Sequence, residues 1–190
     1  MHLDQLKRRE FITLLGGTAA TWPIAAWAQQ GATKRIGVLM GWDENDPEAQ
    51  FNLAAFVQGL QQLGWVDGRN VRIDYRWAND DINRMRMFAK ELVDLQPDVI
   101  LANTTPVTAA LQQETRMIPI VFVIVSDPVS AGFVAGLPRP GGNITGFIHT
   151  EGEIAGKLLE LLTDIAPGVK RVAIMFNPDT APGGGSHYLP

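Results

Sequence analysis

The chain has 190 residues, 46% hydrophobic and 19% charged, a balance typical of a globular protein and not of a disordered one. Sixteen Lys and Arg residues against 20 Asp and Glu residues give a formal charge of −4. Nucleic acid binding requires an excess of basic residues, and this chain has an excess of acidic ones. We therefore expect no nucleic acid partner. With no cysteine, the chain has no disulfide, thiolate metal site or thiol nucleophile, and it suits an oxidising compartment.

Residues 1–28 are predicted to be an export signal that is not part of the fold. A basic run, Lys7–Arg9, is followed by a diluted apolar stretch, and Ala26–Ala28 places small residues where a signal peptidase reads them. The segment Arg8–Ile12 is similar to a twin-arginine signal. The apolar stretch is shorter than the roughly 20 residues that span a bilayer, so we expect export to the periplasm without an anchor. A buried or amphipathic N-terminal helix is the alternative, and Pro23 disfavours it.

From residue 34 onward, short apolar runs alternate with amphipathic stretches, a pattern that predicts the α/β class with a doubly wound parallel sheet. Near-continuous apolar runs predict strands buried on both faces at Ile36–Met40, Val99–Ala102, Ile120–Val125 and Val172–Phe176. Residues 71–77 alternate apolar and charged side chains, which predicts an edge strand with one face in water. A further short strand is expected at Ile144–Phe147.

The first two predicted helices each begin at an aspartate. Asp46 precedes a proline, as an N-cap before the first helical residue, and Gly64 closes that helix. The second helix starts near Asp80 or Asp81 and must stop before Pro97.

Two more helices are expected later in the chain. Thr105 is the predicted N-cap of a short helix that ends before Pro119. The last helix ends at Pro167 and carries an apolar stripe, formed by Leu158, Leu161, Leu162 and Ile165.

A domain boundary is expected near Thr150, after the turn cluster Pro138–Asn143. Residues 29–150 then form a first ligand-binding lobe, and residues 151–190 begin a second. A single helix and a single strand cannot bury all their apolar faces, so we expect the second lobe to be incomplete in this chain.

Open parallel sheets bind ligands outside the carboxyl ends of their strands, which makes the loops there the candidate site. Thr104 and Thr105 start a helix, where they either bind an anion or only cap the helix. Asp127 suits an ammonium group or a ligand hydroxyl, or else forms an Asp-Pro turn. Trp42 either stacks on a flat ligand or packs beneath a loop. Together the loops predict a small zwitterion such as an amino acid.

Signatures of catalysis are absent from the sequence. There is no glycine-rich nucleotide motif and no Gly-x-Ser-x-Gly elbow. His149 and His187 stand apart from each other and from acids at metal-ligand spacing. We therefore expect a binding protein that is not an enzyme, with no cofactor and no metal.

Several blocks occur in a fixed order along the chain: Arg35–Met40, Gly59–Leu60, Leu63–Val71, Asp98–Asn103, Ile118–Phe122, Ser126–Val129, Arg139–Gly146 and Phe176–Pro178. Jointly they resemble the ABC-transporter substrate-binding family related to tryptophan and tyrosine uptake proteins, over essentially all of residues 34–190. The resemblance implies a type I periplasmic-binding fold, with two Rossmann-like lobes that close on a small ligand. It also implies a membrane permease of an ABC importer as partner.

Carried over by position, the resemblance implies first-lobe ligand contacts from Thr104, Thr105, Ser126 and Asp127, and Asn177 at the cleft edge of the second lobe. The family's chains continue well past residue 190. We expect a monomeric periplasmic solute receptor. Two alternatives stay open: an exported sensory module that reports ligand occupancy to a membrane kinase or cyclase, and a truncated, inactive remnant.

Overall fold

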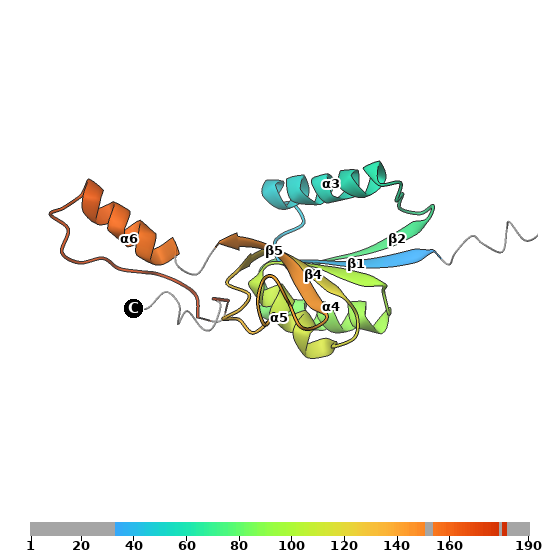
Figure 1. Cartoon of the computed structure of the whole chain (residues 1–190). Helices are drawn as coiled ribbons and strands as arrows, with labels where there is room; N and C mark the ends of the chain where they lie inside the picture. The colour runs from blue at the N-terminus through green and yellow to red at the C-terminus, as the bar shows by residue number, and fades with distance from the viewer. Residues whose placement is uncertain (1–32, 151–153, 179, 182–190) are drawn as a thin grey trace, which may run out of the picture. The chain divides into compact units, whose positions relative to one another are not determined.

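The computed structural model describes residues 33–150, 154–178 and 180–181, so the predicted export signal lies outside the described residues. Five strands form one sheet in the order β2-β1-β3-β4-β5, and every neighbouring pair is parallel (Figure 1). The strands are β1 Lys34–Met40, β2 Val71–Trp77, β3 Val99–Asn103, β4 Ile120–Ser126 and β5 Ile144–Thr150. The prediction of a parallel α/β sheet with β2 at its edge is confirmed.

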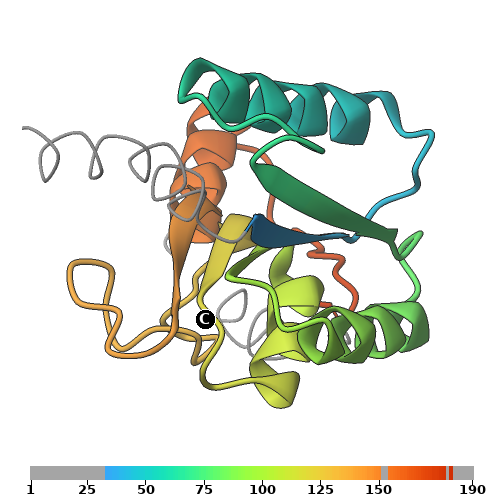
Figure 2. The same cartoon turned by 90° about the vertical axis from the view of Figure 1, so that its right-hand side faces the viewer.

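Helices lie on both faces of this sheet (Figures 1 and 2). Helix α3, Pro47–Gln62, lies on one face, while α4, Ile82–Asp94, and α5, Thr105–Glu114, lie on the other. Helix α6, Ile154–Ile165, follows β5 in the chain. The sheet is therefore doubly wound, as the sequence pattern predicts.

The caps of α3 and α4 follow the predicted chemistry. The Asp46 carboxylate accepts a hydrogen bond from the Ala49 amide at 2.8 Å. Asp81, the second of the two residues proposed for α4, accepts from the amides of Asn83 at 2.7 Å and Arg84 at 3.2 Å. Each carboxylate satisfies N–H groups that have no partner within the helix.

The cap of α5 lies one residue earlier than predicted. Thr104 is the N-cap, with a φ of 84°, and Thr105 is already the first helical residue. Its side chain makes no capping hydrogen bond. Proline is tolerated in the first helical turn, where its missing N–H costs nothing, so Pro106 fits inside the helix and the helix starts earlier.

Side chains that alternate along the strands divide the core into two layers. Towards α4 and α5, Ile100, Ile120 and Phe122 are fully buried with Leu92 and Leu111 of the helices. Towards α3, a smaller layer is formed by Val38, Met40, Ala49, Val71 and Ile73, with Leu53 and Phe56 packed against it.

The expectation that β3 and β4 are buried on both faces is correct for one face only. Leu101, Val121 and Val123, which alternate with the buried positions, are only partly buried, and Phe147 of β5 is 72% exposed. Helix α3 packs mainly on β1 and β2. The core cluster on the α3 side contains no residue of β4 or β5.

The predicted strand Val172–Phe176 is wrong, because residues 169–177 form no regular element. Val172, Ile174 and Met175 are 49%, 53% and 98% exposed. A strand requires a neighbour for its backbone hydrogen bonds, and no described strand pairs with this segment.

Candidate functional site

The carboxyl ends of β1, β3 and β4 lie side by side at one edge of the sheet. The amide of Ser126, at the end of β4, donates a hydrogen bond of 3.4 Å to the hydroxyl of Thr105, at the start of α5. The structure therefore brings the two predicted loop regions together. In the strand order seen here, this edge includes the switch point between β1 and β3, where open α/β sheets bind ligands.

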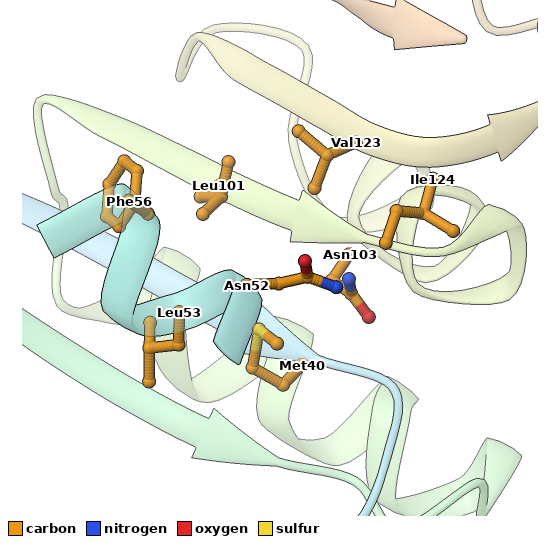
Figure 3. Close-up of a pocket in the computed structure, with 8 residues that line it drawn as sticks. All are labelled: Met40, Asn52, Leu53, Phe56, Leu101, Asn103, Val123 and Ile124. Atoms are coloured by element: carbon orange, nitrogen blue, oxygen red, sulfur yellow. The ribbon is translucent and has the colours of Figure 1, made fainter. Parts of the chain in front are cut away.

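A pocket of about 220 Å³ opens at this switch point (Figure 3). Its lining comes from the middle and C-terminal residues of β1, β3 and β4 and from α3. Six of the eight side chains are apolar and two are amides, and the set is Met40, Asn52, Leu53, Phe56, Leu101, Asn103, Val123 and Ile124. A concave, mainly apolar site with a few polar groups is the usual form of a small-molecule pocket.

Asn103 is the most deeply placed polar residue of this lining, at 1% exposure. Neither its amide nitrogen nor its amide oxygen has a hydrogen-bond partner. The neighbouring Thr104 hydroxyl is also buried without a partner. A buried polar group left unpaired costs about 1–3 kcal/mol, so these atoms call for a bound group that satisfies them.

The backbone is strained along the same edge. Outside glycine, left-handed φ angles occur at Asn79, Asp80, Thr104, Ile124 and Asp127, with values of 54°, 54°, 84°, 56° and 42°. Such a conformation is a true outlier for a β-branched residue. Ile124 adopts it inside an irregularity of β4, between Phe122 and Val125, and lines the pocket. Strain of this kind concentrates at binding sites.

Three carboxylates give this edge a negative character. Burial, and then the charges of Asp46 and Asp43, raise the pKa of Asp80 above its ordinary value. The Asp80 amide donates to the Gly41 carbonyl at 2.7 Å, which holds the loop after β2 against the loop after β1. A ligand cation such as an ammonium group is favoured near these carboxylates.

Three of the predicted contact residues have their own local roles. Trp42 is half-buried against the α3-side core, so its stacking on a ligand stays a prediction. The carboxylate of Asp127 accepts a hydrogen bond from the Ser130 amide at 3.1 Å, as a turn-forming residue does. The carbonyl of Asn177 closes a turn by accepting from Thr180 and Ala181. Ligand contact by these residues stays a prediction.

Sequence reasoning missed the pocket residues themselves. It placed the site in the loops beyond the strand ends, whereas the pocket is lined by residues within the strands and by α3. One signal was available: Asn103 is an amide at the end of an otherwise apolar strand. Among the described residues, no group of three His, Cys, Asp or Glu side chains is placed to hold a metal ion, and no helix is long and apolar enough to cross a bilayer.

A doubly wound parallel sheet with a pocket at its switch point places the chain in the α/β class, in the architecture whose members bind ligands at that point. The chain belongs to the ABC transporter substrate binding protein family, whose sequence profile matches residues 46–183. This confirms the family resemblance predicted from the sequence blocks. One relative is a tyrosine-binding protein of Clostridioides difficile (strain R20291), 35% identical over 122 residues. That match covers 64% of this chain and 35% of the relative.

Solved structures of similar proteins share this fold. A conserved domain protein from Vibrio cholerae has a TM-score of 0.64 and 32% identity, over 73% of this chain and 46% of that one. An ABC domain in complex with L-Trp from Streptococcus pneumonia has a TM-score of 0.63 and 28% identity, over 73% and 45%. A ligand-free, open substrate binding protein with adhesive properties from Clostridium difficile has a TM-score of 0.60 and 34% identity, over 72% and 45%. The chain thus spans about a third of the curated relative and under half of these structures.

Proposed function

We propose that this chain is the extracytoplasmic substrate-binding component of an ABC importer and binds an amino acid or a similar small solute. The ligand binds at the carboxyl edge of the sheet, in a cleft between the lobe of residues 29–150 and a second lobe that begins at residue 151. A membrane permease receives it. The observation that carries the proposal is the pocket at the β1/β3 switch point with the unpaired amide of Asn103 inside it.

The surroundings of the pocket fit a zwitterion. The first turn of α5 presents backbone N–H groups, and the helix dipole favours a carboxylate beside the Thr105 hydroxyl. The carboxylates of Asp43, Asp46 and Asp80 favour an ammonium group. The apolar lining takes the rest of the ligand. These three recognition features together describe an amino acid with a mainly apolar side chain.

The relatives suggest which amino acids to test first. One relative is named a tyrosine-binding protein, and one solved neighbour contains L-Trp. Both names describe ligand binding, and no catalytic step is proposed for this chain. We propose the periplasm as the compartment, on the basis of the predicted export signal at residues 1–28.

Isothermal titration calorimetry of the full chain against L-tyrosine, L-tryptophan, L-alanine and L-glutamate tests the proposal. We expect saturable heat with one molecule per chain for at least one aromatic amino acid. Thr105→Val keeps the side-chain size but removes the hydroxyl, and it is expected to weaken binding about tenfold. The matched control is Thr163→Val on α6, which should leave affinity unchanged. A folded sample that gives no heat with any of the four ligands contradicts the proposal.

A further inference from the structure

We propose that Asn103 is a specificity-determining residue of the pocket, and that it selects ligands whose aromatic ring carries a hydroxyl group, as L-tyrosine does. The inference rests on the proposed function, because it concerns the same site. It goes further by assigning the discrimination between amino acids to one side chain.

The pocket has the size and the walls for an aromatic ring. A dry apolar cavity of about 150 Å³ is enough to bind benzene. The pocket at the switch point holds about 220 Å³, which leaves space for a ring and a substituent. Phe56 and Leu53 of α3 form one wall, and Leu101 and Val123 of the sheet form another (Figure 3). Such surfaces favour a flat apolar group over a polar chain.

The amide of Asn103 sets a polar requirement inside this apolar space. It offers a donor at Nδ2 and an acceptor at Oδ1, and both are buried and unpaired. A phenolic hydroxyl donates and accepts at once, so it can satisfy both atoms. A phenyl ring leaves both unpaired, and an indole N–H satisfies only the acceptor. Hydrogen bonding to the Asn103 amide therefore predicts a higher affinity for tyrosine than for tryptophan or phenylalanine.

The lining has no cationic side chain, which argues against binding of a ligand carboxylate by the Asn103 amide. A ligand carboxylate would accept from Nδ2, but no cationic side chain is among the eight that line the pocket. An unpaired carboxylate in apolar surroundings carries a large desolvation cost. The second amide of the lining, Asn52, is less buried than Asn103, so water can satisfy it when the ligand does not. Discrimination is therefore assigned to Asn103.

The test compares L-tyrosine, L-phenylalanine and L-tryptophan on the full chain by calorimetry. The wild-type chain should prefer tyrosine over phenylalanine by about tenfold to a hundredfold, the range expected when a buried polar group loses its partner. Asn103→Leu has a similar size and no hydrogen-bonding atoms. It should lose this preference and bind phenylalanine at least as tightly as the wild-type chain does. A gain for phenylalanine cannot result from misfolding.

Two further variants complete the design. Asn83→Leu makes the same change at an exposed position of α4, and it should keep the wild-type preference. Asn103→Ala serves if Asn103→Leu does not fold, and it should also lose the preference for tyrosine.

Equal wild-type affinities for tyrosine and phenylalanine overturn the inference and leave the proposed function standing. A retained preference in Asn103→Leu overturns it as well. The inference is also overturned if Asn103→Leu has a higher free energy of unfolding than the wild-type chain and unchanged affinities for the amino acids. The pocket is then only a gap in the packing. No binding of any amino acid overturns both the inference and the proposed function.

Discussion

Asp80 shows how the candidate site bears on stability at the level of a single residue. Burial and the charges of Asp46 and Asp43 raise its pKa above the ordinary value. The folded chain therefore holds the Asp80 proton more tightly than the unfolded chain does. Ionised Asp80 destabilises the fold at neutral pH, and this penalty disappears as the pH falls below the ordinary Asp pKa of about 3.9.

Replacing Asp80 by Asn tests this charge effect. Asp80→Asn should raise the melting temperature at pH 7, and the difference from the wild-type chain should shrink as the pH is lowered towards 4. Thermal melts monitored by circular dichroism between pH 4 and pH 8 measure it. Asn also tolerates the left-handed φ of 54° at this position. A difference that stays constant across the pH range would therefore assign the effect to the backbone and contradict the charge argument.

Sequence patterns predicted the loops at the carboxyl edge of the sheet as the candidate site, but they did not single out the most buried polar group of the pocket. Thr105 and Ser126 were each predicted as ligand contacts at the carboxyl edge of the sheet. A hydrogen bond joins them, and ligand contact by either stays a prediction. Asn103 was not among the predicted contact residues, because strand periodicity does not show that its amide is enclosed beside α3 and unpaired. The one-residue shift of the α5 cap is local, since Pro106 is tolerated in the first helical turn and Thr104, with a φ of 84°, takes the cap position.

The pairing of β4 with β5 depends on a close contact at the level of the elements. Gly146 of β5 is the register partner of Phe122 of β4. A Cβ atom on Gly146 would overlap the carbonyl oxygen of Phe122 and meet its ring at 2.6 Å. Because Phe122 is fully buried in the core, the ring has no free space to move into.

Gly146→Ala is therefore expected to lower the free energy of unfolding by about 2 kcal/mol or more, through overpacking at the strand pair. Urea denaturation followed by fluorescence measures the change. Gly142→Ala is the matched control, because a Cβ there meets no atom within 4 Å. This control should stay within about 0.5 kcal/mol of the wild-type chain. Equal effects of the two substitutions would contradict the steric argument.

Element boundaries were predictable wherever a local signal marks them. Asp46, Asp81 and Gly64 mark helix ends by chemistry that acts within a few residues, and the structure agrees. Val172–Phe176 has the composition of a buried strand but forms none. Apolar composition predicts what a segment favours, whereas a strand forms only where another strand supplies hydrogen bonds.

Buried apolar side chains are distributed unevenly along the chain. Within residues 34–144, the sheet and its helices contain the buried core. In α6 the apolar stripe remains exposed, with Leu158 at 58%, Leu161 at 54% and Ile165 at 74%. Exposed apolar side chains contribute little to stability, because the hydrophobic contribution scales with the area removed from water. We therefore propose that the unit ending at Thr150 folds independently of the residues that follow.

A chain ending at Thr150 should unfold cooperatively, with a free energy of unfolding within about 1 kcal/mol of the 190-residue chain. Urea titration of both chains measures this. Leu111→Ala changes a fully buried position and serves as a control. It should lower the free energy of unfolding of both chains by a similar amount, about 2–5 kcal/mol, which shows that the measurement reports the core. Loss of the cooperative transition in the shorter chain would contradict an independent first lobe.

The sequence by itself determined the parallel α/β sheet, the edge position of β2, the caps of α3 and α4, and the family, because all of these follow from local periodicity, capping chemistry and ordered motifs. Only the tertiary structure decided that Asn103 lies unpaired in a pocket, that Ile124 turns into that pocket, and that residues 172–176 form no strand. These features depend on which segments meet in space. Burial, enclosure and strand pairing are properties of several chain segments together, and no single segment encodes them.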